Sequence, residues 1–219
     1  MEMVLEPDEP AAGPRRVVEL GELVDLIVGS GRPWGRPRIV AVDGRGGAGK
    51  STLVERMRAL VPRSAVVHTD DVAWHHAFFG WADLLGKHVL EPLRRGDGVD
   101  YRPPAWLERG RAGSILVAAG LDVVFVEGTG IVRSELAPLI DASVWVQVDA
   151  VEAARRLVAR DGDSPEQRRL VDEWNREEGP FLLRERPWER ADVVVVAGQV
   201  LEHDPATSVV IAPAVAPGS

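Results

Sequence analysis

The stretch that decides the fold is RIVAVDGRGGAGKSTLVERM, residues 38–57, where an apolar run leads through a glycine-rich loop into a segment of helical spacing. Residues 44–51 within it match the pattern G-x-x-x-x-G-K-[ST] without a gap. Glycines allow successive backbone N–H groups to curl around phosphate oxygens, and the N-terminus of the following helix adds a positive dipole. The stretch therefore predicts a buried strand, a phosphate-binding loop and a helix, in that order.

The phosphate-binding loop predicts a nucleotide cofactor. The residues expected to bind it are Gly44, Gly46, Gly47, Ala48, Gly49, Lys50, Ser51 and Thr52. Lys50 is suited to bridge the β- and γ-phosphates during catalysis, and the hydroxyl of Ser51 is suited to bind Mg²⁺. A GTPase would need an Asn-Lys-x-Asp motif, and the only other lysine, Lys87, lies between Gly86 and His88. We therefore expect ATP and Mg²⁺ as cofactors, and the chain length of 219 residues favours a kinase of small molecules.

Short apolar runs alternate with helical segments along most of the chain. The runs expected as further strands are residues 65–67, 122–126, 142–148 and 191–196, and the expected helices include residues 81–95, 134–140, 151–160 and 166–186. Strands that are apolar on both faces must be buried on both faces. A parallel sheet that lies between two layers of helices meets this requirement. We therefore predict a three-layer α/β/α P-loop NTPase fold with a five-stranded, mostly parallel sheet.

The chain divides into a core and two flanking segments. The predicted divisions are residues 1–37, a tail with a leading helix, residues 38–198, the P-loop kinase core, and residues 199–219, a C-terminal tail. The core includes an acceptor-binding insertion at about 74–119 and a lid at about 155–169. In the flanking segments, residues 1–14 are expected to be loose, a helix starts at Val17, and residues 208–211 are a candidate edge strand.

Acidic residues follow three of the expected strands. Ligands of parallel sheets bind beyond the carboxyl ends of the strands, so these positions are candidate site residues. Asp70 is suited to accept the proton of a substrate hydroxyl or to hold a water molecule on Mg²⁺, and Glu127 is suited to lie near the metal. Ser51, Asp70 and Glu127 are therefore the expected metal-site residues. Asp149 is expected to cap the helix that follows it.

Arginines and aromatic residues provide the remaining candidates. Arg156 and Arg160 are four residues apart on one expected helix, where they are suited to neutralise a phosphoryl group in transfer or to form a solvated basic face. Aromatic residues are dense between the second and third strands, and they either wall a substrate pocket or belong to a core. These are Trp74, Phe78, Phe79, Trp81 and Trp106. His75 and His76 lack a third ligand for a metal site.

An ordered set of motifs accompanies the phosphate loop. The set comprises Asp70, the run LEPLRRG at residues 90–96, Glu127-Gly128, Arg156-x-x-x-Arg160-Asp161, and ERADV at residues 189–193. With this set, the chain resembles the uridine kinase branch of P-loop kinases, which also holds phosphoribulokinase and pantothenate kinase, over most of residues 38–196. The resemblance implies ATP·Mg²⁺ as phosphoryl donor and a hydroxyl group as acceptor. It also implies Asp70 as base, Ser51 and Glu127 as magnesium groups, and Arg160 as part of the lid.

The acceptor region departs from the resemblance. Uridine kinases carry a Tyr and a His in the hairpin that meets the base, whereas residues 101–109 read YRPPAWLER and place Arg109 near the position of that His. The arginine-rich lid that follows Asp161 in the family is also short here. Asp83 matches the ribose-binding acid of the family. The expected substrate residues are therefore Asp70, Asp83, Tyr101, Trp106 and Arg109.

Charge and composition limit the partners. The chain holds 34 acidic residues against 26 lysines and arginines and has no cysteine, so we expect no nucleic-acid binding, no disulfide and no thiol chemistry. No apolar run has the length of a membrane span, and a cytoplasmic location is expected. The leading function is a small-molecule kinase with a nucleoside-like acceptor. An antibiotic- or metabolite-modifying kinase and a non-catalytic ATP-binding module remain as alternatives.

Overall fold

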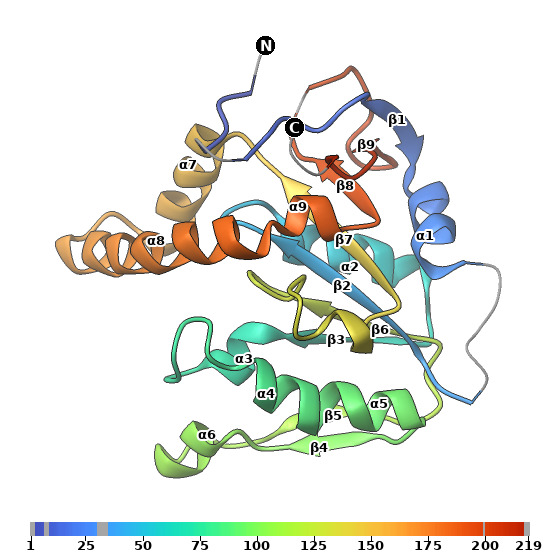
Figure 1. The fold of residues 1–219 in the computed structure, drawn as a ribbon, viewed down its shortest axis with the longest axis vertical. Coiled ribbons are helices and arrows are strands. Elements are labelled where there is room, and N and C mark those ends of the chain that lie inside the picture. The colour runs from blue at the N-terminus through green and yellow to red at the C-terminus, as the bar shows by residue number, and fades with distance from the viewer. Residues whose placement is uncertain (1–2, 7–8, 30–34, 199, 217–219) are drawn as a thin grey trace.

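The computed structural model describes residues 3–6, 9–29, 35–198 and 200–216, which hold a seven-stranded mixed sheet of order β1-β9-β8-β7-β2-β6-β3 (Figure 1). Its strands are β1 Arg16–Glu19, β2 Arg38–Gly44, β3 Ser64–His68, β6 Val123–Glu127, β7 Ala142–Gln147, β8 Val193–Val196 and β9 Ser208–Ala212. The five strands from β8 to β3 run parallel, whereas β9 and β1 are antiparallel to their neighbours. The predicted five-stranded sheet is therefore the parallel part of a larger one.

The two additional strands come from the flanking segments. The strand expected at residues 208–211 is present as β9, but β1 covers its outer side, where Val18 pairs with Val209. The helix expected from Val17 begins later, as α1 (Leu20–Val28), and Val17 belongs to β1. The strand has only four residues and directly precedes a helix. Its alternation of apolar and polar residues is therefore too short to be distinguished from the helical pattern that follows.

Strand β2 shows how the sheet divides two cores. Val40 and Val42 pack into the core under α1 and α2 (Lys50–Leu60), whereas the alternate residues Ile39 and Ala41 pack into the opposite core. The opposite core lies against α4 (Ala82–Leu85), a π-helical turn (Gly86–Leu90) and α5 (Glu91–Arg95), with the hairpin of β4 (Val99–Tyr101) and β5 (Ile115–Val117) beside them. The three-layer prediction is thus confirmed.

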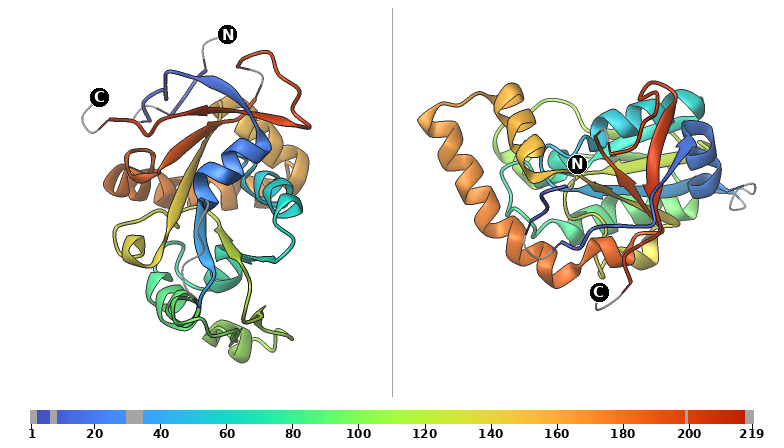
Figure 2. Two further views of the ribbon diagram at one scale, coloured as in Figure 1. Left: turned by 90° about the vertical axis from the view of Figure 1, so that its right-hand side faces the viewer. Right: turned by 90° about the horizontal axis from the view of Figure 1, so that it is seen from above.

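A third core lies on the other half of the sheet. There, Trp145 of β7 and Trp188 of α9 (Pro187–Arg190) are fully buried, with ring centroids 5.7 Å apart. The end of the long helix α8 (Pro165–Glu185) packs beside them through Leu182. Helix α8 continues through Pro180 without interruption. Figure 2 shows α8 running along one side of the molecule from α7 to α9.

The remaining elements are short except for α7. They are α3 (Thr69–Ala73), α6 (Pro104–Glu108), a 3₁₀ turn (Ala137–Leu139) where a helix was expected at residues 134–140, and α7 (Ala150–Asp161). Asp149 caps α7 as predicted, because its carboxylate accepts the N–H groups of Val151 and Glu152 at 3.0 and 3.1 Å. No helix in the described ranges is both long enough and apolar enough to span a membrane.

The described part of the N-terminal segment is not loose, contrary to the sequence prediction. The N–H of Val4 donates to Asp149 at 2.8 Å, and the N–H of Ala12 donates to the side chain of Gln147 at 3.0 Å. Residues 9–15, here called the N-terminal arm, follow the sheet beside β7, and Ala12 is buried in the third core. A composition rich in proline and glutamate concealed this contact, because the anchoring groups lie more than 130 residues away in the chain.

The arrangement places one end of the sheet beneath the longest helix. The parallel strands run toward the side from which α3, α7 and α8 project (Figure 1). The carboxyl ends of β2, β3 and β6 therefore meet there, which is where ligands of parallel sheets bind.

We expect Phe125→Ala to lower the free energy of unfolding by about 3–5 kcal/mol, because Phe125 is fully buried on β6 and its loss leaves a cavity. Leu116→Ala is the matched control, since Leu116 on β5 is 73% exposed, and should change stability by less than about 0.5 kcal/mol. Urea unfolding of both variants measures the difference. Equal losses would contradict the assigned register of β6.

Candidate active site

The phosphate loop turns from β2 into α2 directly beneath α7. Gly47 has a φ of 75°, in the left-handed region, and a Cβ atom there would clash with the backbone carbonyl of Ala153 on α7. A glycine is therefore required at this position by both backbone conformation and space. Gly49, which precedes α2, also lies in the left-handed region, with a φ of 94°.

Some amides of the loop are used to hold its shape, and others are free. The N–H groups of Gly44, Gly46 and Ala48 donate, respectively, to Asp43, to Glu178 and to the carbonyl of Arg45. Within the described ranges, no acceptor is hydrogen-bonded to the N–H groups of Gly47, Gly49, Lys50 and Ser51. Free amides at a loop and helix N-terminus are donors for a phosphate group.

Lys50 lies across the loop toward the end of β6. Its ammonium donates to the carbonyls of Gly44 at 2.7 Å and Arg45 at 3.0 Å, and to the hydroxyl of Thr129 at 3.2 Å. The hydroxyl of Thr129 in turn donates to the carbonyl of Gly44 at 2.9 Å. Thr129 was not singled out from the sequence, in which it is one of many threonines and serines.

A cavity of about 540 Å³ brings together predicted residues from separate elements. Its wall includes Lys50, Ser51, Asp70, Glu127 and Arg160, which come from α2, α3, β6 and α7. Two loop glycines, Gly46 and Gly47, also line it. The acidic strand ends and the phosphate loop thus face one space, as their positions in the sequence predicted.

Glu127 is the centre of a polar contact that includes Ser51 and His68. Its Oε1 accepts the hydroxyl of Ser51 at 2.9 Å and lies 2.6 Å from Nδ1 of His68. Burial acts to raise the pKa of Glu127, but the hydrogen bonds from His68 and Ser51 outweigh it, and the pKa lies below its ordinary value. The same hydrogen bond raises the pKa of His68. An ionised carboxylate beside a hydroxyl is a donor set that suits Mg²⁺, whose other ligands are ordinarily water and phosphate oxygens.

The described residues hold no group of three or more His, Asp or Glu side chains placed to bind a metal by themselves. Asp70, the third predicted metal residue, lies in the same cavity at the start of α3.

Asp70 reaches solvent through the cavity, yet the surrounding protein raises the pKa of its carboxyl. The largest cause is removal of water by the neighbouring protein, and the charge of Glu127 acts in the same direction, while Lys50 opposes it. A carboxyl group with a raised pKa is a better proton acceptor than an ordinary aspartate.

The two predicted arginines lie on different sides of the loop. Arg160 lines the large cavity and forms a paired hydrogen bond with Asp161, with both contacts at 2.7 Å. Arg156 lines a second cavity of about 440 Å³, together with Gly49 and Thr52. Its Nε donates to Glu152 at 2.9 Å.

The structure does not bring four of the predicted substrate residues to the large cavity. Asp83 is exposed on α4, and Arg109 is exposed at the end of α6. The ring of Tyr101 stacks on His88 at 4.5 Å, and Trp106 is buried and donates to the carbonyl of Asp71 at 2.8 Å. The hairpin packs against the α4–α5 layer, so this expectation is corrected.

The cavity is walled instead by the segment after α3 and by α8. The aromatic members are Trp74, Phe78 and Trp174. Trp174 forms edge contacts with Phe78 at 5.5 Å and tilted contacts with Phe79 at 5.3 Å. The expected aromatic cluster therefore divides, because Trp74 and Phe78 line the cavity whereas Trp81 and Trp106 belong to the core. Trp174 was missed because it follows the ordinary helical spacing of α8.

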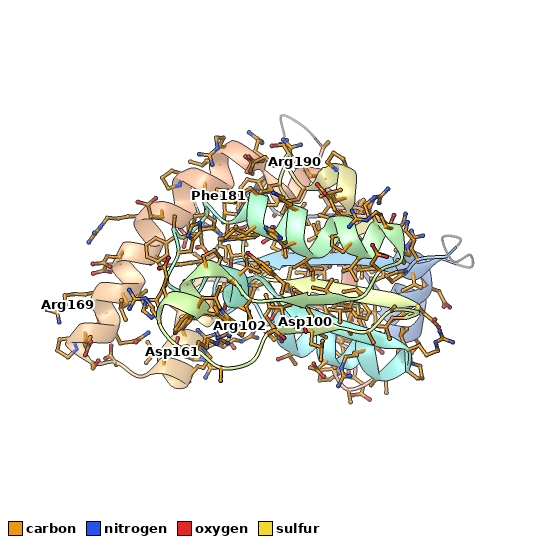
Figure 3. All side chains as sticks on the ribbon, turned by 90° about the horizontal axis from the view of Figure 1, so that it is seen from below. Asp100, Arg102, Asp161, Arg169, Phe181 and Arg190 are labelled. Carbon is orange, nitrogen blue, oxygen red and sulfur yellow. The ribbon has the colours of Figure 1, made fainter. Side chains whose placement is uncertain are left out.

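The first residues of α8 overlap the segment at about 155–169 that the sequence analysis predicts as a lid. Gln167, Leu170 and Val171 of α8 line the cavity, while Arg169 lies on its outer side and Phe181 packs toward the body (Figure 3). The cavity-facing part of α8 thus extends beyond the predicted lid boundary, to Trp174.

Asp43, at the end of β2, ties two loops together beneath the cavity. Its Oδ1 accepts the N–H groups of Gly44 at 2.7 Å and Gly130 at 2.8 Å, and its Oδ2 accepts the N–H of Val132 at 2.8 Å. Burial raises the pKa of Asp43 to about 6, although the three N–H groups and Lys50 act to lower it. Because the folded protein then binds this proton more tightly than the unfolded chain does, Asp43 stabilises the fold most at acidic pH.

We expect the contribution of Asp43 to be lost as the pH rises from its ordinary pKa of 3.8 through about 6. A shift of about two units corresponds to a change of about 3 kcal/mol in the free energy of unfolding. Urea unfolding of the wild type and of Asp43→Asn over this window measures it, and the advantage of the wild type should shrink toward neutral pH. A difference that stays constant with pH would contradict the assignment.

Comparison with solved structures places the fold. The structure of a possible uridine kinase from Bacillus stearothermophilus matches at a TM-score of 0.56 and 18% identity, over 80% of this chain and 96% of that one. A candidate fructose transport system kinase from Silicibacter sp. TM1040 matches at a TM-score of 0.53 and 18% identity, over 77% and 95%. No protein-family model and no curated protein sequence matches the chain. The chain therefore has the fold of the uridine kinase-like P-loop kinases.

Proposed function

We propose that the protein is an ATP-dependent kinase that transfers the γ-phosphate of ATP to a hydroxyl group of a small molecule. The observation that carries the proposal is the convergence of Lys50, Asp70, Glu127 and Arg160 on one cavity beside the free amides of the phosphate loop. These groups supply a phosphate cradle, a base and two cations, which are the parts that phosphoryl transfer requires.

Two of the cavities beside the loop suit the two ends of the nucleotide. The smaller one, lined by Gly49, Thr52, Arg156 and Ala197, is the candidate site for the adenosine part. The loop amides and Lys50 would bind the phosphates, so that the γ-phosphate enters the larger cavity. Ser51 and Glu127 would hold Mg²⁺, which supplies positive charge to the phosphate oxygens when bound.

Asp70 is the candidate base. Its carboxylate would take the proton of the acceptor hydroxyl as that oxygen forms a bond to the γ-phosphorus and the bond from the γ-phosphorus to the oxygen bridging to ADP breaks. Lys50 and Arg160 would neutralise the charge of the phosphoryl group in transfer. The breaking of the Arg160–Asp161 pair is the rearrangement that this role requires.

The acceptor is best matched by a molecule with a flat ring. Trp74, Phe78 and Trp174 give the cavity a wall of aromatic rings, which favours stacking on a planar group such as a nucleoside base. The same wall would accept another ring-bearing metabolite or an antibiotic, which remains the alternative acceptor class. A non-catalytic ATP-binding module is disfavoured, because such a module needs no carboxylate with a raised pKa in this cavity.

We expect Asp70→Asn to retain ATP binding and to lower acceptor-dependent ADP release by about 100-fold or more, the usual contribution of a positioned base. Asp71→Asn is the matched control, because Asp71 lies outside the cavity and forms an ion pair with Arg111 at 2.6 Å. Calorimetry with ATP·Mg²⁺ and a screen of hydroxyl compounds, starting with nucleosides, measure the two effects. Full turnover of Asp70→Asn with any phosphorylated acceptor would overturn the assignment of the base.

We expect Trp74→Ala to raise the KM of the acceptor found in that screen by about tenfold, because it removes a ring from the cavity wall. Arg109→Ala should leave this KM unchanged, since Arg109 is exposed and lies outside the cavity. Steady-state kinetics at saturating ATP measures both variants. If Arg109→Ala were the more damaging of the two, the acceptor would bind beside the hairpin instead.

A further inference from the structure

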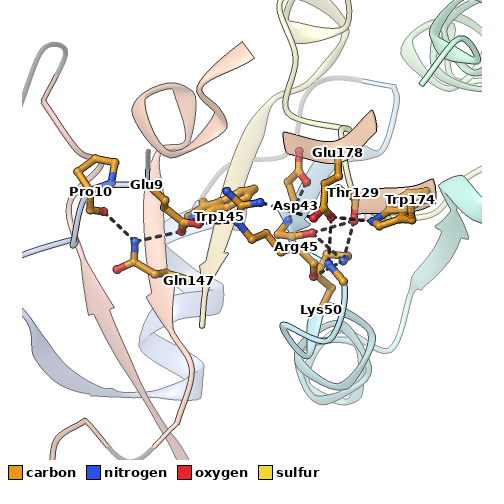
Figure 4. A network of polar contacts seen from close by, with 12 residues as sticks. Glu9, Pro10, Asp43, Arg45, Lys50, Thr129, Trp145, Gln147, Trp174 and Glu178 are labelled. Carbon is orange, nitrogen blue, oxygen red and sulfur yellow. Dashed lines mark hydrogen bonds and ion pairs between the residues drawn. The ribbon is translucent and has the colours of Figure 1, made fainter. Parts of the chain in front are cut away.

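Arg45 occupies a position that the phosphate-loop motif leaves unspecified, yet its side chain is only 14% exposed. Its Nε donates to Oε2 of Glu9 at 2.9 Å, and its Nη1 lies 3.5 Å from Oε2 of Glu178. One guanidinium in the loop is thus held between a carboxylate from the N-terminal arm and a carboxylate from α8 (Figure 4). We call these three residues the carboxylate brace.

Glu9 is fixed on the sheet by two further donors. Its Oε1 accepts Nε1 of Trp145 at 2.8 Å and Nε2 of Gln147 at 3.1 Å, and its side chain is only 2% exposed. Gln147 also holds the arm through Pro10 and Ala12, at 2.9 and 3.0 Å. An ionised carboxylate this deeply buried is costly unless it is paired, and Arg45 is the cation that pairs with it.

Glu178 contacts the loop backbone as well as the guanidinium. Its Oε1 accepts the N–H of Gly46 at 3.2 Å and Nε1 of Trp174 at 3.0 Å. Trp174 lines the large cavity, so the helix that walls this cavity also fixes the loop. Two successive loop residues, Arg45 and Gly46, are therefore each held by a side chain from a distant part of the chain.

This fixation matters because the loop is rich in glycine and loses much conformational freedom when it is ordered. The brace engages Arg45 and Gly46 but leaves the N–H groups of Gly47, Gly49, Lys50 and Ser51 free within the described ranges. Donors that are already oriented bind an anion without a further ordering cost. The brace thus leaves these four N–H groups available to a phosphate.

We propose that Glu9 and Glu178 are positioning residues of the nucleotide site, which hold the phosphate loop through Arg45 and Gly46 in the conformation that binds nucleotide. The N-terminal arm is then a part of this site, although it lies outside the predicted core. This inference rests on the proposed function, because it assumes that the loop binds a nucleotide.

The test measures the binding of ATP·Mg²⁺ to the full chain in the absence of acceptor. Calorimetry and tryptophan fluorescence are the two readouts. Glu9→Gln keeps an oxygen for Trp145 and Gln147 but removes the charge that faces Arg45. We expect Glu9→Gln and Glu178→Gln each to weaken nucleotide binding by about tenfold or more, as small displacements of a binding group do. The double variant should bind little more weakly than the worse single one, because both act on the same loop.

One control variant and one further pair of variants separate positioning from general stability. Glu55→Gln on α2 is the control, since Glu55 pairs with Arg58 at the surface and should leave binding unchanged. Arg45→Lys, which keeps the charge, should bind ATP more tightly than Arg45→Met at equal thermal stability. The KM of the acceptor at saturating ATP should not change in Glu9→Gln or in the Arg45 variants, whereas a general loss of folded structure would affect both substrates.

The proposed role of the brace would be overturned if Glu9→Gln bound nucleotide as tightly as the wild type does. It would also be overturned if Arg45→Lys and Arg45→Met bound nucleotide equally well. The second comparison decides the matter if Glu9→Gln does not fold. A wild type that binds no ATP would instead contradict the proposed function itself and remove the brace with it. A wild type that binds ATP, with brace variants that bind it equally well, overturns only the brace.

Discussion

The buried carboxylate of Asp43 is the constraint on which the candidate site depends. It accepts N–H groups from the start of the phosphate loop and from the loop after β6, so the ends of two neighbouring strands are joined at one point. Thr129, in the second of these loops, contacts both Lys50 and the carbonyl of Gly44. Lys50 is thereby positioned by a loop that Asp43 also holds. A buried acceptor with three backbone donors is rigid, which suits a site that must hold its shape before a ligand arrives.

From this point outward, the site is assembled from two parts of the fold. Glu127 ends a strand of the parallel sheet, and Ser51 and Asp70 lie at the starts of the helices that follow β2 and β3. Arg160 and Trp174 lie instead on α7 and α8, which project from the sheet. The first part carries the residues that we propose as base and metal-site residues, and the projecting part carries Trp174 of the aromatic wall and Arg160. Glu178 links the two parts, because it lies on α8 and contacts the backbone of Gly46.

The basic side chains around the phosphate loop differ in whether they are free to bind a ligand. Acidic groups exceed basic ones in the chain as a whole, yet Lys50, Arg45 and Arg160 gather around the phosphate loop. Each of these cations already has an oxygen partner, namely backbone carbonyls, Glu9 or Asp161. Lys50 and Arg160 can exchange such partners for phosphate oxygens, whereas Arg45 is held by buried carboxylates on both sides. Of these three cations, Lys50 and Arg160 are thus available to a ligand, whereas Arg45 stabilises the structure of the loop.

The phosphate loop, the parallel strands around it and the acidic residues that follow them could be predicted from the sequence. Each of these features lies in a short continuous stretch with its own periodicity or motif. The sequence also led to the cap at Asp149 for the same reason. The tertiary structure alone decided that the hairpin of Tyr101 packs away from the cavity, that Trp174 walls it, and that Glu9 reaches Arg45 from the N-terminal arm. These features join residues far apart in the chain, and their spacing carries no local pattern. They depend on how distant segments pack on the faces of the sheet after its strands have paired. No single segment of the sequence contains that information.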